Sequence, residues 1–231
     1  VISKFNTNNV VDMREMFYGC KRLLSLSLSH FSTVSVTNME SMFQNMEQLK
    51  RLDISHFNLR RVTTTKSMFD GCFSLSSLSL STSSTPLLNT MNEMFKDCEK
   101  LTSLDMTGFD TSQVYSFVNL FYNCKSLTSL DLSTFDTSQS VYMNSMCENC
   151  ESLTYLNLKN WDTSWAINMA SMFQNCKSLT SLDVSFFDTS RLELLTNMFQ
   201  NCSSLTSIDI SGFKLTSNVK KFNHLFDGCN K

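Results

Sequence analysis

Residues 127–150 read LTSLDLSTFDTSQSVYMNSMCENC, and this stretch is one copy of a unit that recurs along the 231-residue chain. Each step between copies is 26 residues, except the last, which is 27. Such regular self-similarity is typical of a solenoid, in which each repeat forms one coil and stacks on its neighbours. The copies are marked by Met16-Phe17, Met42-Phe43, Met68-Phe69, Met94-Phe95, Leu120-Phe121, Met146-Cys147, Met172-Phe173, Met198-Phe199 and Leu225-Phe226.

The Leu-Asp-Leu-Ser part of each unit predicts a short strand. In one copy Leu130 and Leu132 alternate with Asp131 and Ser133. This alternation buries one side of the strand and exposes the other to water. Strands one repeat apart return in the same direction after a full coil, so we expect them to pair in parallel, with right-handed connections.

The segment after the strand predicts a turn and then a helix. The Phe-Asp-Thr-Ser sequence at 135–138 combines an aromatic core residue with side chains that cap turns and helix starts. The following apolar residues have offsets that trace one face of a helix; in one copy they are Val114, Phe117, Leu120, Phe121, Cys124 and Leu127. We therefore predict an α/β solenoid, a right-handed coil with one short parallel strand and one short helix per 26-residue repeat.

The repeat leaves no internal domain boundary, so residues 1–231 are predicted to form a single solenoid of about eight to nine coils. The first residues align with the strand of the next copy, and neither end carries the polar, atypical repeat that caps a solenoid. We expect the chain to be an excerpt of a longer array without its caps. One irregular place, residues 79–86, contains Pro86 and lacks the Phe-Asp pair, which predicts a distorted turn.

Composition argues against two kinds of partner. The formal net charge is −2, and no run of Lys and Arg is long enough for the basic patch of a nucleic-acid-binding protein. No apolar run approaches the roughly 20 residues of a membrane-spanning helix. We expect no nucleic-acid partner and no membrane span within this stretch.

Three segments carry a resemblance to a known family: FDTSQV at 109–114, MFQNCKSLTSLDVSFFDTS at 172–190 and MFQNCSSLTSIDIS at 198–211. They resemble the 26-residue repeat of bacterial surface proteins, which belongs with the BspA-like leucine-rich repeats. The resemblance covers essentially the whole chain. It implies a leucine-rich-repeat-like solenoid that is extracellular or attached to a surface and serves adhesion or recognition of protein partners. It offers no catalytic residues.

The exposed side of the predicted strands carries the candidate binding residues. Equivalent residues stack coil upon coil, so they would form one continuous face of Asp105, Asp131, Tyr155, Asn157, Asp183 and Asp209. Like charges in neighbouring strands destabilise each other modestly, so some benefit must offset the repetition. Three interpretations are open: a soluble surface, contact with a protein partner, or binding of calcium, which takes oxygen ligands. A second column, Asp110, Asp136, Asp162 and Asp188, is better explained by turn capping.

Eight cysteines occupy one column of the repeat: Cys20, Cys72, Cys98, Cys124, Cys150, Cys176, Cys202 and Cys229. Stacked coils would bring neighbouring cysteines within reach of a disulfide, but their side chains would run parallel rather than converge. Free cysteine is among the most buried residue types, so we expect a structural column of buried thiols. Cys147 and Cys150 form a C-x-x-C pair, for which a redox or metal role is the alternative to two core positions.

No constellation of catalytic or cofactor-binding residues is visible. His30 and His56 stand one coil apart in one column, and two stacked imidazoles could bind a metal or sense pH, but no third ligand is in register. A Ser-His-Asp set cannot be assembled by repeat register, and neither a nucleophile elbow nor a phosphate-binding loop occurs. We predict no enzyme activity, no metal and no cofactor.

The sequence favours a non-catalytic adhesion or recognition module, at a cell surface or secreted. Its partners would be extracellular or cell-surface proteins, bound through an extended face of the solenoid by many weak contacts. The alternative is a structural role in which copies of the chain stack end to end into a filament or coat.

Overall fold

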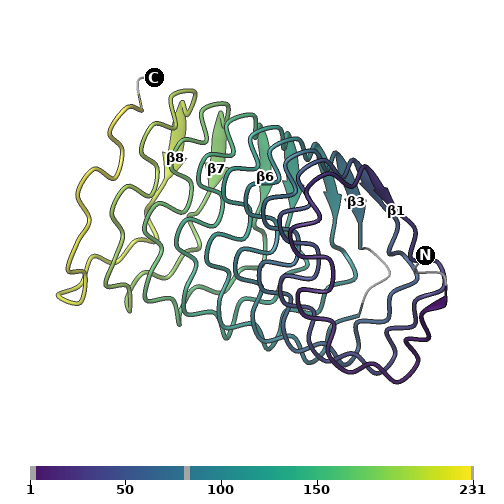
Figure 1. The fold of residues 1–231 in the computed structure, drawn as a ribbon. Helices are drawn as coiled ribbons and strands as arrows, with labels where there is room; N and C mark the ends of the chain where they lie inside the picture. Colours follow the sequence, from purple (N-terminus) through teal and green to yellow (C-terminus); the bar gives the residue numbers. More distant parts are fainter. Residues whose placement is uncertain (1–3, 81–83, 230–231) are drawn as a thin grey trace.

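The computed structural model describes residues 4–80 and 84–229. It shows successive coils stacked along one axis, with the short strands in a row on one side (Figure 1). The predicted distorted turn at 79–86 includes residues 81–83, which lie outside the described residues. The strands are β1 (Ser25–Leu26), β2 (Arg51–Leu52), β3 (Ser77–Ser79), β4 (Ser103–Asp105), β5 (Ser129–Asp131), β6 (Tyr155–Asn157), β7 (Ser181–Asp183) and β8 (Ser207–Asp209).

Every strand pair is parallel and in register by one repeat. Leu130 of β5 is opposite Leu156 of β6, and Asp183 of β7 is opposite Asp209 of β8. The pairs form a four-stranded sheet, β1-β2-β3-β4, and two two-stranded sheets, β5-β6 and β7-β8. The prediction of a solenoid with one short parallel strand per repeat is therefore confirmed.

A second line of parallel contacts follows another side of the coils. Single residues of successive coils pair there, each with its equivalent in the next coil. The last pairing joins Leu194 to Lys221, so the extra residue of the final repeat lies before Lys221. The column comprises Asp12, Asn38, Thr64, Thr90, Ser116, Tyr142, Asn168, Leu194 and Lys221.

The predicted helix is wrong: none of residues 4–80 and 84–229 lies in an α-helix. An α-helix needs a negative φ at every residue and an amide bonded to the carbonyl four residues back. Here Asn149 has a φ of +62°, and its amide donates to the Gln174 carbonyl of the next coil at 2.8 Å. The Cys150 amide instead closes a tight turn onto the Cys147 carbonyl at 3.2 Å. The segment is therefore a run of turns whose remaining amides bond to the next coil.

Two positions in each repeat have this left-handed backbone. One lies two residues before the second residue of the Met-Phe pair that marks each copy. The other lies immediately before the column position that is usually cysteine. The second position is held by residues that tolerate positive φ better than others. Its members are Gly19, Asn45, Gly71, Asp97, Asn123, Asn149, Asn175, Asn201 and Gly228.

The core runs along the solenoid as stacked columns of apolar side chains. Phe43 and Phe69 stack with ring centroids 5.4 Å apart, and Phe69 and Phe95 with centroids 5.6 Å apart. Cys147 takes the place of Phe in this column between Phe121 and Phe173, and it is buried as well. Offset and near-parallel ring pairs add to the burial energy of the coils.

A buried threonine in most of the turns joins neighbouring coils; Leu59 takes its place in one coil. The Thr137 hydroxyl donates a hydrogen bond to the Asp162 carbonyl at 2.8 Å and accepts one from the Asp162 amide at 2.9 Å. The Thr side chain, expected to cap its own turn, therefore bonds to the next coil, whereas the preceding Asp caps the turn within its coil, as Asp136 does for the Ser138 amide. The same buried column contains Thr7, Thr33, Thr85, Thr111, Thr137, Thr163 and Thr189.

Candidate interaction surface

The six residues predicted to form a binding face all lie on one side of β4 to β8. Asp105, Asp131, Tyr155, Asp183 and Asp209 are exposed, and Asn157 is half-buried. The leucines between them, such as Leu130 and Leu156, point inward and are buried. We call this set of six residues the strand face. Its outward direction follows from the period-two alternation of each strand.

Each aspartate of the strand face also holds the turn that follows its strand. The Ser133 amide donates to Asp131 Oδ1 at 2.9 Å, and the Ser185 hydroxyl donates to Asp183 Oδ1 at 2.7 Å. Between coils, Asn157 Nδ2 donates to the same oxygen of Asp131 at 3.1 Å. The carboxylates are therefore fixed in position by short local bonds.

These local bonds also keep the carboxylates ionised. Hydrogen bonds from the Ser133 hydroxyl and amide lower the pKa of Asp131 below its usual value. Hydrogen bonds from the Ser211 hydroxyl and amide act on Asp209 in the same way and lower its pKa. A carboxylate that accepts such bonds favours its charged form, so both residues carry negative charge at neutral pH.

Shallow hollows follow the strand face. One lies over β7 and β8 and is lined by Asp183, Asp209, Ser181, Ser185 and Ser207. It presents carboxylate and hydroxyl oxygens to solvent. The arrangement can accept hydrogen bonds and attract cations, but it does not enclose a small molecule.

The column cysteines line the core. From Cys72 onward, each column thiol donates to the carbonyl oxygen of the second residue of the Met-Phe pair one coil back, as from Cys124 to Phe95 at 3.2 Å. All nine cysteines are free; Cys20 is exposed and Cys229 half-buried, whereas Cys72, Cys98, Cys124, Cys147, Cys150, Cys176 and Cys202 are buried. Burial raises the pKa of Cys72 and of Cys202 to about 12. Such thiols stay protonated and unreactive, which favours a structural role for the column.

The two histidines of the predicted pair are engaged locally. His56 Nε2 lies 3.0 Å from the Leu28 carbonyl oxygen. The ring of His30 meets the edge of Phe31, with centroids 5.0 Å apart. Within the described part of the chain, no three His, Cys, Asp or Glu side chains are grouped so that they could hold a metal ion.

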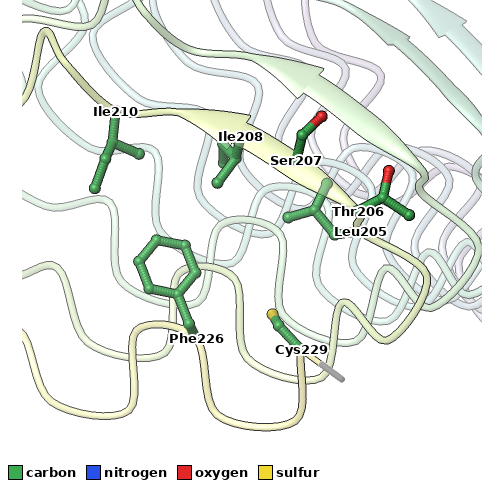
Figure 2. A pocket seen from close by; sticks show the side chains of 7 residues that line it. All are labelled: Leu205, Thr206, Ser207, Ile208, Ile210, Phe226 and Cys229. Carbon is green, nitrogen blue, oxygen red and sulfur yellow. The ribbon is translucent and has the colours of Figure 1, made fainter. Parts of the chain in front are cut away.

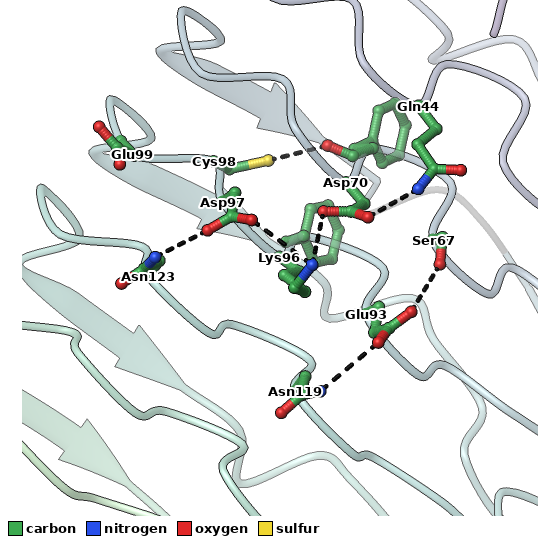
Figure 3. Close-up of polar contacts among 12 residues, drawn as sticks. Gln44, Ser67, Asp70, Glu93, Lys96, Asp97, Cys98, Glu99, Asn119 and Asn123 are labelled. Carbon is green, nitrogen blue, oxygen red and sulfur yellow. Dashed lines mark hydrogen bonds and ion pairs between the residues drawn. The ribbon is translucent and has the colours of Figure 1, made fainter.

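A polar cluster on the turn side of the coils was missed by the sequence analysis (Figure 3). The buried Asp70 accepts a hydrogen bond from Gln44 at 2.7 Å and lies 3.5 Å from Lys96 Nζ. Burial raises the pKa of Asp70, and Lys96 opposes that effect. Asp97 contacts Lys96 from the other side and accepts a bond from Asn123. Asp70 and Lys96 occupy one column of the repeat, so a column-by-column search for opposite charges would have found the pair.

A pocket at β8 is lined mainly by core positions of the repeat, together with the exposed Thr206 and Ser207 (Figure 2). Its lining includes Ile208, Ile210, Phe226 and Cys229. The equivalents of these residues one coil earlier are buried, for example Phe199 in the column of Phe226. The pocket therefore exposes the stacking surface of a coil rather than a site built for a ligand.

Comparison with known families assigns the chain to one family. A family model described as "Mycoplasma protein of unknown function, DUF285" matches residues 1–103, 45–157, 89–208 and 151–231, and these overlapping matches cover the whole chain. The chain belongs to the DUF285 family. The predicted membership of a surface-protein repeat family is confirmed at this family level. Curated proteins include no match to the chain.

Solved structures similar to this DUF285 chain include two leucine-rich repeat proteins. One, from Bacteroides ovatus ATCC 8483, is 18% identical with a TM-score of 0.34; the match covers 90% of this chain and 66% of that protein. The other, a leucine rich cell surface protein from Faecalibacterium prausnitzii A2-165, is 16% identical with a TM-score of 0.33; the match covers 94% of this chain and 73% of that protein. This chain thus spans just under two thirds of the length of the Bacteroides protein. Across the described residues, no helix is long and apolar enough to cross a membrane.

Proposed function

We propose that the chain is a non-catalytic recognition module, at a cell surface or secreted, that binds protein partners through the strand face. The observation that supports this most is the exposed row of Asp105, Asp131, Asp183 and Asp209, placed in register by the stacking of coils. Stacked parallel strands lie about 4.7–4.9 Å apart, so the row offers two pairs of charges on neighbouring coils, separated by the neutral Asn157.

The strand face would act as a rigid, negatively charged strip. Its carboxylates are fixed by their turns, so a partner meets them with little loss of side-chain freedom. Positively charged side chains of the partner would be attracted by the row, which raises the association rate and makes binding weaker at high salt. Tyr155, exposed within the row, adds an aromatic contact of the kind that is enriched in interfaces.

The test is binding of the purified chain to a panel of extracellular-matrix and cell-surface proteins, comparing Asp131→Lys with Asp12→Lys. The control is matched in charge and local bonding, because Asp12 is exposed and its Oδ1 also accepts an amide hydrogen bond, from Arg14 at 2.8 Å. Loss of binding with Asp131→Lys alone is the expected result. Equal binding by the two variants would remove the strand face from consideration.

A further inference from the structure

A different side of the coils carries an exposed group of aromatic and aliphatic side chains. Tyr115 is 47% exposed, Tyr142 is 42% exposed and Trp165 is 50% exposed. The Val141 amide donates to the Tyr115 carbonyl and the Ile167 amide to the Val141 carbonyl, both at 2.9 Å, so Tyr115, Val141 and Ile167 lie in one column on successive coils. We call Tyr115, Val141, Tyr142, Trp165 and Ile167 the aromatic patch.

The fold does not require apolar residues at these positions. The column of Tyr115 holds Thr37 and Thr63 in earlier coils, where the Thr63 amide makes the equivalent bond to the Thr37 carbonyl at 2.8 Å. The position of Trp165 holds Gln113 and Gln139 in the two preceding coils. The same backbone is thus built with polar side chains in other coils; Val11 and Leu87 are single exposed apolar residues of the two columns, whereas the patch gathers several on neighbouring coils. Contiguous exposed apolar groups of this kind mark interaction sites.

The residue types of the patch are those that contribute most to protein interfaces. The guanidinium of Arg191 lies over the ring of Trp165, 4.1 Å from its centroid, and fixes the orientation of the indole. Trp, Tyr and Arg dominate the residues whose truncation costs most binding energy. The fixed indole therefore supplies a rigid anchor at the edge of the patch.

A row of carboxylates borders the patch. The Ser164 amide donates to Asp162 Oδ1 at 2.9 Å, and the Ala166 amide to the Thr163 carbonyl at 3.0 Å, so Asp162 immediately precedes the turn that contains Trp165. Asp110 and Asp136 are the equivalents of Asp162 in the preceding coils, and all three are exposed. Among residues 4–80 and 84–229, no Lys or Arg forms an ion pair with any of these three carboxylates.

We infer that the aromatic patch binds a cationic amphipathic segment of a partner protein. Apolar side chains of that segment would pack on Tyr115, Val141, Ile167 and Trp165, while its Lys or Arg residues reach the bordering carboxylates. The charge of the border selects this occupant, because an acidic segment would meet unneutralised carboxylates next to the apolar contact. This surface is separate from the strand face, so either binding proposal can be wrong while the other holds.

The test uses the fluorescence of Trp165. The only other tryptophan, Trp161, is buried in the column of Phe109, Phe135 and Phe187, so Trp161→Phe restores the residue found elsewhere and leaves Trp165 as the sole emitter. The probes are two synthetic amphipathic peptides of identical apolar pattern, one with Lys and one with Glu at every polar position. We expect the Leu/Lys peptide to shift the emission to the blue, the Leu/Glu peptide to have no effect, and added salt to weaken binding.

Matched variants locate the site. Trp165→Gln, which installs the residue of the two preceding coils, is compared with Tyr18→Gln, which removes an exposed aromatic that belongs to neither surface and installs the residue of the next coil, Gln44. In the chain that retains both tryptophans, titration of a labelled Leu/Lys peptide should show at least about a tenfold loss of affinity for Trp165→Gln and no change for Tyr18→Gln. Equal binding of both peptides, or unchanged affinity of Trp165→Gln, would overturn the inference. Emission of the peptide-free chain that shifts with its own concentration would also overturn it, because a second copy would then cover the patch.

Discussion

The thiol of Cys150 donates a hydrogen bond to the carbonyl oxygen of Phe121, 3.2 Å away in the preceding coil. The same contact recurs from Cys72 to Phe43 and from Cys202 to Phe173. Each of these carbonyls also accepts an amide hydrogen bond within its own coil, as Phe121 does from Cys124 at 3.1 Å, so the thiol takes the second lone pair of the oxygen. The cysteine column is therefore part of the bonding between coils.

The buried thiols should resist alkylation until the chain unfolds. The reactive form is the thiolate, and burial raises the pKa of Cys72 and Cys202 to about 12, so at neutral pH both remain protonated in the folded chain. Counting of thiols with a chromogenic disulfide should give fast reaction at Cys20 and slow reaction at the buried column. Rapid reaction of all nine cysteines in the native chain would contradict the burial.

The same shifts predict how stability depends on pH. The usual thiol pKa is 9.0, and the folded values for Cys72 and Cys202 are about 12. Above pH 9 the unfolded chain loses these protons while the folded chain retains them, so the free energy of unfolding should fall as the pH rises from about 9 to about 12. Denaturant unfolding at several alkaline pH values measures this, with Cys72→Ala expected to reduce the slope.

Replacement of a turn threonine tests the bonding between coils. Thr137→Val keeps the shape but removes the hydroxyl that bonds both the carbonyl and the amide of Asp162. Buried groups left unpaired cost about 1–3 kcal/mol, so the free energy of unfolding should fall by that order. Thr154→Val, at an exposed threonine that donates only to the Thr128 carbonyl, should cost much less. Similar losses in the two variants would argue against the bridging role.

Substitution of Ser171 distinguishes a run of turns from a helix. Its φ is +58°, a conformation that costs a residue with a side chain about 1–2 kcal/mol and costs glycine little. Ser171→Gly should therefore be more stable than Ser171→Ala by about 1 kcal/mol. In a helix the order would be reversed by about the same amount, because alanine is the best helix former and glycine a poor one. Thermal unfolding of the two variants decides between these orders.

Truncation of a strand leucine tests the placement of the core. Leu130 is buried in β5, and Leu130→Ala should lower the free energy of unfolding by about 2–5 kcal/mol because it leaves a cavity. Ser129→Ala, at the exposed neighbour in the same strand, is the control and should be close to neutral. A loss below about 0.5 kcal/mol for Leu130→Ala would contradict the assigned packing.

The strands could be predicted from sequence because Leu130, Asp131 and Leu132 alternate with the period of a strand and recur at a fixed spacing. That fixed spacing also placed Asp183 opposite Asp209, so the strand face followed from register alone. The helix was predicted wrongly because Phe117, Leu120 and Phe121 have offsets that a run of tight turns also satisfies. The sequence does carry the missing signal: Gly, Asn or Asp precedes each column position, where the backbone takes positive φ.

Side-chain bonds between coils were harder to predict. The bridge from Thr137 to Asp162 depends on how the turn of one coil is placed relative to the turn of the next coil. The repeat period of the sequence does not give that placement. The ion pair of Asp70 with Lys96 and the stacking of Arg191 on Trp165 each join two residues of one column on neighbouring coils. Such contacts become visible only when the coils are aligned and read across, because neighbours in space are about one repeat apart in sequence.

The central claim is that equivalent residues of successive coils lie side by side, so that the exposed chemistry forms continuous rows. Pyrene excimer fluorescence tests this most directly, in a chain carrying Cys20→Ser and Cys229→Ser so that labelling is confined to introduced thiols. Pyrene on Asp131→Cys with Asn157→Cys, which are register partners on β5 and β6, should give strong excimer emission. The pair Asp131→Cys with Asp209→Cys, three coils apart, should give monomer emission alone. Monomer emission alone from the first pair, or excimer emission of equal strength from the second, would contradict the stacking.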